Sequence, residues 1–181
     1  MRDKQTIVAY HEAGHAVAHW LARIAIESIT IDRVGEEHPR VKTDEASLQL
    51  IPFDEAAPRL LIIAGAGYSA DLIHLKLSDP QASPYQLDGY QTDQRQAYGL
   101  LDQMGLKFPN EGFYKHEAHE QLRQPETWLK VALVAEQVLC NRTMTRVAFE
   151  DAMAGLEPFS DAYWTDLEAR RQAWWRENFG S

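Results

Sequence analysis

The sequence predicts a single, mainly helical domain with a small β-sheet beside its first helix. Apolar residues recur with helical spacing over most of the chain. One stretch, residues 26–34, instead alternates and is rich in β-branched residues, as strands are. The chain has 181 residues, the length of one domain, and no linker or internal repeat divides it.

Helix and strand boundaries in the first half follow from capping and turn residues. Asp3 is a candidate N-cap for a first helix that ends near residue 22. The strand of residues 26–34 comes next. It is followed by a turn at residues 35–39 and by two short strands, expected at residues 40–43 and 47–51.

The rest of the chain is predicted to be helical. A second helix begins within residues 52–58 and continues to about residue 77. Thr92 is expected to cap a third helix, which runs from Asp93 to Met104 and stops at Gly105. Further helices are expected at residues 111–122, 125–140, 145–156 and 160–178. The resulting organisation is a first helix (1–24), a small sheet (26–51), two helices joined by a loop (54–105) and C-terminal helices (110–181).

The first helix contains the motif H-E-x-x-H, as His11-Glu12-Ala13-Gly14-His15. Residues four apart lie on one helix face, about 5–6 Å apart, so both imidazoles can reach one metal ion. Glu12 would lie beside that ion, where it can take a proton from a bound water. The alternative is a buried helix with two hydrogen-bonded histidines. Glycine inside a helix costs about 1 kcal/mol relative to alanine, so we expect another backbone to approach closely at Gly14.

A catalytic zinc site has three protein ligands and an open position, so a third His, Asp or Glu is required. The longer motif H-E-x-x-H-x-x-G-x-x-H is absent, because Ala18 and Leu21 occupy its later positions. His19 is about 12 Å from His11 along the helix axis and is expected to be structural. The remaining histidines are weaker candidates: His38 and His74 are isolated, and His116 and His119 are expected on a solvated polar face.

Composition limits the function classes. The net charge of −9 argues against nucleic acid or an anionic membrane as the main partner. No apolar run approaches the roughly 20 residues that span a bilayer. The N-terminus has no signal-peptide pattern, so we expect a cytoplasmic protein. The single cysteine, Cys140, is expected to be a small buried hydrophobic residue.

Residues 9–17, which read A-Y-H-E-A-G-H-A-V and are followed by Ile29-Thr30-Ile31, resemble the peptidase domain of the FtsH-type (M41) zinc metalloproteases. That family takes its third zinc ligand from an aspartate in a G-A-x-x-D-[IL]-x-x-A segment. Gly89, Asp93 and Ala97 match this pattern. The resemblance therefore implies Asp93 as the third ligand, with Asp88 as the fallback.

The resemblance covers most of residues 7–155, with departures. The family's small-residue helix reads L-A-G-R-A-A-E-E-L, whereas residues 63–72 lack its arginine and glutamate. Gly65 and Gly67 instead leave a smooth face for another helix. Gln94 replaces an aliphatic residue, and neither the ATPase module nor the membrane anchor of FtsH proteins is present in this sequence. The resemblance thus implies a free-standing, helical, zincin-like metallopeptidase domain.

The expected function is zinc-dependent hydrolysis of peptides or unfolded proteins, with one zinc per chain held by His11, His15 and Asp93 and with Glu12 as general base. Other divalent ions tolerate the same ligands. We expect the substrate to lie extended along the edge formed by Ile29–Val34.

Two other functions stay open. One is a retired protease fold that acts as a binding or adaptor module, with a separate ATPase as partner. The other is a single-domain regulatory protease of the repressor-cleaving kind, whose glutamate-type third ligand would not be Asp93. The aromatic last helix is expected either to dock on the body or to bind a partner protein or a second copy. Its aromatic and apolar residues are Tyr163, Trp164, Leu167, Trp174, Trp175 and Phe179.

Overall fold

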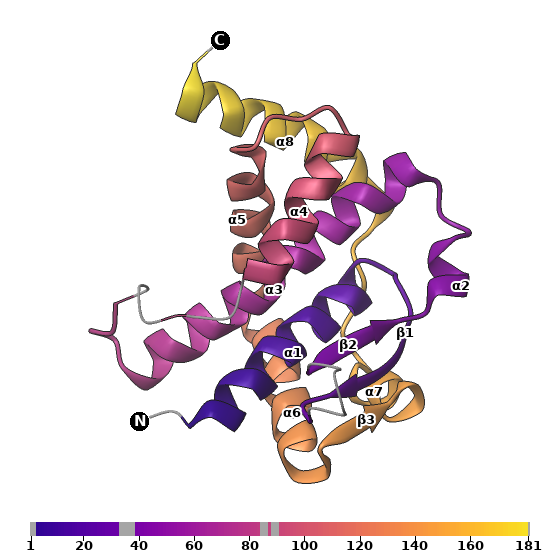
Figure 1. Cartoon of the computed structure of the whole chain (residues 1–181), viewed down its shortest axis with the longest axis vertical. Helices are drawn as coiled ribbons and strands as arrows, with labels where there is room; N and C mark the ends of the chain where they lie inside the picture. Colours follow the sequence, from indigo (N-terminus) through magenta and orange to yellow (C-terminus); the bar gives the residue numbers. More distant parts are fainter. Residues whose placement is uncertain (1–2, 33–38, 84–86, 88–90, 181) are drawn as a thin grey trace.

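The computed structural model describes residues 3–32, 39–83, 87 and 91–180, and it confirms a mainly helical protein with a small antiparallel sheet. The helices are α1 (Lys4–Leu21), α2 (Glu45–Leu48), α3 (Phe53–Ser78), α4 (Gln91–Gln103), α5 (Asn110–Leu122), α6 (Pro125–Asn141), α7 (Arg146–Ala152) and α8 (Asp161–Phe179). The strands are β1 (Ile26–Thr30), β2 (Arg40–Thr43) and β3 (Thr143–Thr145). Helices α1 and α3 run side by side at the centre, between the sheet with α6 and α7 at one end and α4, α5 and α8 at the other (Figure 1).

Helix α1 begins as predicted, because the Asp3 side chain accepts a hydrogen bond from the Thr6 amide at 2.8 Å. The helix then packs against α3 and α6 through small buried residues. Gly14 lies at the closest approach to α3. A Cβ there would lie 2.5 Å from the Cβ of Ala70 and 2.7 Å from the carbonyl oxygen of Ala66. The expected close approach of another backbone at Gly14 is therefore confirmed.

The sheet has the strand order β2-β1-β3, and both pairings are antiparallel. The prediction of a free edge at Ile29–Val34 is wrong over the part that is described. Ile29 pairs with Val41 on one side and with Met144 on the other. Strand β3 was not predicted, and its pairing makes β1 the central strand. Within the described residues, β2 pairs only with β1, so the outer edge of β2 faces no other strand.

The predicted strand at residues 47–51 is also wrong. Asp44 accepts hydrogen bonds from the amide and the hydroxyl of Ser47, at 3.2 and 2.7 Å, and this cap starts the short helix α2 instead.

The start of α4 also differs from the prediction. This helix begins at Gln91, so Thr92 lies inside α4 and is not its N-cap. The expected stop at Gly105 is confirmed, since this glycine adopts a φ of +66°.

Helix α3 is the central element of the core. The expectation that no apolar run approaches the length of a membrane span is corrected here, because among the described residues α3 is a helix that is long and apolar enough to cross a membrane. A core helix meets the same criteria, and 56% of the most apolar stretch of α3 is buried. The smooth face predicted for its glycines is occupied by α5 at Gly65, where a Cβ would lie 2.9 Å from the Cα of Lys115.

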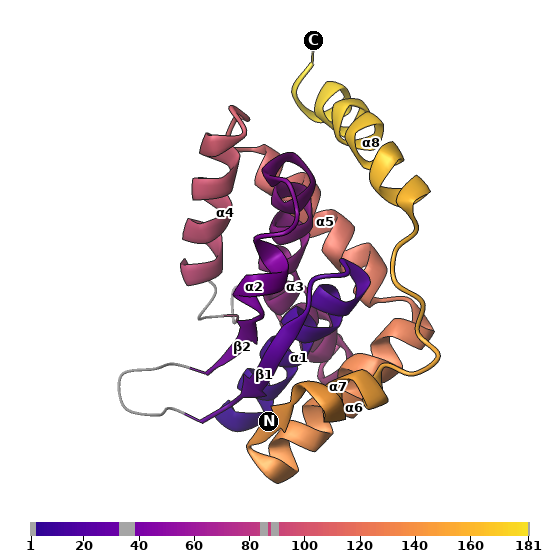
Figure 2. The same ribbon diagram turned by 90° about the vertical axis from the view of Figure 1, so that its right-hand side faces the viewer.

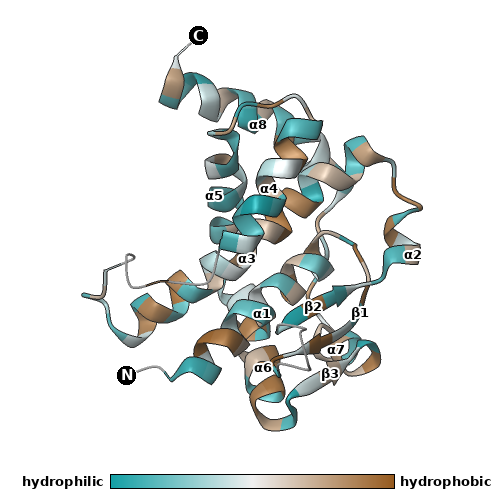
Figure 3. Ribbon diagram, in the orientation of Figure 1, coloured by the Kyte–Doolittle hydropathy of each residue, from teal (hydrophilic) through white to brown (hydrophobic). Residues whose placement is uncertain are grey.

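Helix α8 lies along α5, on the far side of the molecule from α4 and β2 (Figure 2). The contact is polar as well as apolar, which fits the many hydrophilic residues on α5 and α8 in Figure 3. Leu167 is buried, and Glu117 accepts hydrogen bonds from the Tyr163 hydroxyl at 3.1 Å and from Arg170 at 2.5 Å. Of the two arrangements expected for the aromatic last helix, the structure shows docking on the body of the protein.

One sequence expectation for the C-terminal half is confirmed in part and another is corrected. His116 is exposed as expected for a solvated face, whereas His119 is half-buried, and burial lowers its pKa. Cys140 is exposed, not buried, because the core-facing side of α6 is formed by Val131, Val134, Ala135 and Val138.

Candidate metal centre

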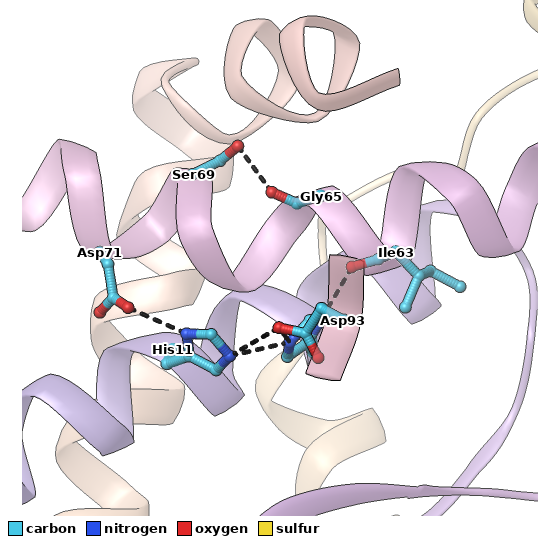
Figure 4. A network of polar contacts seen from close by, with 7 residues as sticks. His11, Ile63, Gly65, Ser69, Asp71 and Asp93 are labelled. Carbon is cyan, nitrogen blue, oxygen red and sulfur yellow. Dashed lines mark hydrogen bonds and ion pairs between the residues drawn. The ribbon is translucent and has the colours of Figure 1, made fainter. Parts of the chain in front are cut away.

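Three predicted ligands from two helices meet at one point (Figure 4). His11 and His15 come from successive turns of α1, and their Nε2 atoms are 3.1 Å apart. Asp93 comes from the first turn of α4, with Oδ2 at 3.1 Å from Nε2 of His11 and 3.3 Å from Nε2 of His15. All three ligand atoms lie within 4.8 Å of one another, and no other group of this kind occurs in the described ranges.

The far sides of both imidazoles are held by hydrogen bonds. Nδ1 of His15 lies 2.8 Å from the carbonyl oxygen of Ile63, which can only accept, so this nitrogen carries the proton. Nδ1 of His11 donates in the same way to the Asp71 carboxylate at 2.9 Å. In their neutral forms both rings therefore turn an Nε2 lone pair toward the other ring. Two lone pairs at 3.1 Å repel each other unless a proton or a metal cation lies between them.

Gly67 provides the space for this arrangement. A Cβ at this position would lie 2.4 Å from Nε2 of His15 and 2.6 Å from Nε2 of His11. Gly67 was predicted to be part of a smooth helix-packing face, and the structure places it directly against the Nε2 atoms of His11 and His15. Only glycine leaves both imidazoles in these positions.

The electrostatics of the site favour a cation. Burial would lower the pKa of His11, but hydrogen bonds with Asp71 and Asp93 outweigh it and raise this pKa to about 10. Burial would likewise raise the pKa of Asp93, and the hydrogen bonds from His11 and His15 instead hold it well below its usual range. Three carboxylates, those of Glu12, Asp71 and Asp93, surround two imidazoles. A divalent cation neutralises such a set better than a single proton.

Glu12 is 7% exposed and lies on the helix between the two ligands. Burial raises its pKa, while His15 and His11 oppose the increase, and a hydrogen bond with the Val41 backbone also lowers it. Glu12 lines the same cleft as His11, His15 and Asp93, interacts electrostatically with all three and is not one of the three candidate ligands. A carboxylate in such a cleft could serve as a general base.

A cleft of about 1030 Å³ opens over the candidate site. Its base is α1, and its walls come from β2 on one side, from α4 on the other and from part of α3. The strand that borders the cleft is therefore β2, from Arg40 to Thr43, and not the Ile29–Val34 segment expected from the sequence. An extended polypeptide in the cleft would run beside the outer edge of β2.

The remaining predicted histidines do not join the ligand group. His19 is buried at the edge of the cleft, and burial together with His15 lowers its pKa to about 3, which agrees with a structural role. His74 stacks on Tyr10 with ring centroids 3.7 Å apart. His38 and the fallback ligand Asp88 lie outside the described residues.

Sequence reasoning missed three contributors, all on α3: the Asp71 carboxylate, the Ile63 carbonyl and Gly67. No local signal points to the Ile63 carbonyl. The apolar run around Asp71 was a usable signal, since an acidic side chain in a buried helix needs a partner. The donor set, with its fixed ring orientations, fits zinc well, since zinc binds histidine nitrogen and carboxylate oxygen with tetrahedral geometry.

A scan of known protein families and a search of curated proteins find no match to this chain.

Asp71→Asn is expected to weaken zinc binding by about 10- to 100-fold, the usual effect of losing a carboxylate behind a histidine ligand. The amide keeps the shape but no longer stabilises the Nδ1–H of His11 by charge. Competition with a chromophoric chelator measures the affinity. Asp79→Asn, at the exposed C-terminal end of the same helix, is the control and should bind like the parent. Equal affinities for parent and Asp71→Asn would show that Asp71 does not orient the ligand.

Proposed function

We propose that this protein is a zinc-dependent metallopeptidase that cleaves flexible or unfolded polypeptides. The observation that carries the proposal is the convergence of His11 Nε2, His15 Nε2 and Asp93 Oδ2 in a cleft, with a buried glutamate beside them. The resemblance of residues 9–17 and 89–97 to the FtsH-type (M41) peptidases points to the same chemistry. It is a resemblance in motifs only.

In the proposed reaction His11, His15 and Asp93 hold the zinc ion. The ion, when bound, polarises the scissile carbonyl and lowers the pKa of its water toward about 7. Glu12 takes a proton from the attacking water as the new C–O bond forms. Glu12 then passes that proton to the leaving amine as the C–N bond breaks, so it returns to its carboxylate form. Asp71 and the Ile63 carbonyl keep the two imidazoles oriented throughout.

The substrate in this proposal lies between β2 and α4. Its backbone adds to the outer edge of β2 as an extended strand, which requires a segment without its own secondary structure. This supports flexible peptides and unfolded proteins as the substrate class. Folded proteins would need prior unfolding by a separate partner.

The first test is the zinc content of the purified protein, measured by elemental analysis beside an Asp93→Ala variant. We expect one zinc per chain in the parent, a clear loss in the variant, and peptide cleavage that a chelator abolishes and added zinc restores. Zinc unaffected by the variant would move the third ligand elsewhere. A parent that takes up no zinc would overturn the peptidase proposal and favour an adaptor role for a retired protease fold.

A further inference from the structure

Gly99 is an exposed glycine in the middle of α4 whose position the packing of the chain does not require. At Gly14, Gly65 and Gly67 a side chain would collide with a neighbouring helix or with an imidazole. At Gly99, by contrast, a Cβ would meet no heavy atom within 4 Å beyond its own turn of helix, among the residues that the structure describes. Alanine would favour the helix more than glycine does. The packing of the described residues therefore does not explain why position 99 is glycine and not alanine.

This space belongs to the cleft above the candidate metal centre. Gly99 lines the cleft together with Thr92, Gln96, Leu100 and Gln103, which form one face of α4. The apolar lining residues on α3 are Leu60, Ile63 and Ala64, and others come from α1 (Ile7 and Val8) and from the β2 side (Pro39 and Val41). A ligand side chain that enters the cleft at α4 meets the bare backbone at Gly99 and the neighbouring Leu100, opposite the apolar α3 residues of the lining.

The distance from the ligand Asp93 locates this space along a bound peptide. Gly99 is six residues beyond Asp93, which places it about 9 Å along the helix axis. An extended chain covers about 3.3 Å per residue. A substrate side chain above Gly99 would therefore belong to the second or third residue from the bond that is cleaved.

We propose that Gly99 opens a subsite that accepts a bulky apolar side chain of the peptide, two or three residues from the scissile bond. This inference rests on the proposed function for the identity of its ligand. The missing side chain at Gly99 sets the size that the subsite accepts, and the apolar cleft residues on α3 and α4, namely Leu60, Ile63 and Leu100, set the preference for aliphatic and aromatic groups. A leucine at position 99 would occupy the same volume and exclude them.

The test compares zinc-loaded parent, Gly99→Leu and a control, Asp102→Leu. The control places the same side chain on an exposed position of α4 outside the cleft lining. Mass spectrometry of a digested peptide library gives the residue preference at each position around the cut. We expect a preference for Phe and Leu at one such position in the parent and the control. Gly99→Leu should lose this preference. Its kcat/KM for the Phe peptide should fall to about a tenth of the parent value, while kcat/KM for the Ala analogue should stay nearly unchanged. Identical profiles in all three proteins would overturn the subsite.

A second measurement does not depend on cleavage. Alanine-based decapeptides with one Phe placed at each position in turn, and lysines at the ends, are offered to zinc-loaded Glu12→Gln protein in a fluorescence-polarisation competition. The peptide with Phe at one particular position should bind about tenfold tighter than the all-alanine peptide. Introducing Gly99→Leu into the same Glu12→Gln protein should remove this difference. If the parent cleaves nothing but the binding preference is present, the peptidase proposal fails and the subsite stands. If no register is preferred, the subsite is wrong.

Discussion

Replacing Glu12 by glutamine is expected to leave the zinc content unchanged and to lower kcat/KM for peptide cleavage by about 100- to 10,000-fold, the usual contribution of a positioned general base. Glutamine has nearly the same shape, so the buried position between the ligands stays filled. An amide cannot take a proton from the attacking water at neutral pH. The variant should therefore bind zinc and peptide and fail at the chemical step.

The measurements for this prediction are elemental analysis and steady-state cleavage of a fluorogenic peptide. Glu27→Gln is a matched control, because it makes the same chemical change at a half-exposed position on β1, where Glu27 pairs with Lys42. This control should keep the activity of the parent. If Glu12→Gln turned over substrate as fast as the parent, Glu12 would not be the base, and the proposed reaction would need another proton acceptor.

Much of the helical architecture is predictable from the sequence because local signals define it. Asp3 and Ser160 cap α1 and α8 through hydrogen bonds to amides three residues on, and Pro125 occupies a first-turn position of α6. These contacts lie within one turn of helix, so a short window of sequence contains both partners. The same reasoning failed at residues 47–51, where the Asp44 cap determined the structure more strongly than the apolar residues that suggested a strand.

The sheet shows why pairing is harder to predict than propensity. Strand β3 has only three residues and follows α6 directly, where Arg142 adopts a left-handed conformation at the helix end. Nothing local shows that these residues pair with β1, more than a hundred positions earlier. Without β3, β1 looks like an edge strand. With it, the outer edge of the sheet at the cleft is β2.

The residues of the candidate site likewise fall into those that local sequence predicts and those that only tertiary packing brings together. His11, Glu12 and His15 share one helix face, so their spacing alone groups them. Asp93 is 82 residues from His11 and was identified only through the resemblance to a family motif. The contact of Asp71 with His11 depends on the register in which α1 packs along α3, which no local pattern describes. A sequence therefore indicates residues that share a helix and leaves out those that only tertiary packing brings together.

Gly67→Ala is expected to reduce zinc affinity by more than about 100-fold, exceeding the effect of a residue that only orients one ligand. The added methyl group would lie 2.4 Å from Nε2 of His15 and 2.6 Å from Nε2 of His11, so both rings must turn away from their hydrogen bonds with Ile63 and Asp71. Stability should change little. Alanine in a helix interior gains about 1 kcal/mol over glycine, which offsets part of the cost of displacing the two imidazoles.

Chelator competition for zinc and thermal unfolding of the metal-free protein separate these two effects. Gly112→Ala on α5 is the control, because its Cβ would make ordinary contact with Trp174 at 3.5 Å, away from the site. The control should bind zinc like the parent. A Gly67→Ala protein that unfolds like the parent but has lost zinc would link the loss to the two imidazoles and not to a damaged fold. If Gly67→Ala keeps the parent's affinity, the ion cannot be held by the ring atoms that face α3, and His11 and His15 would not be its ligands in this arrangement.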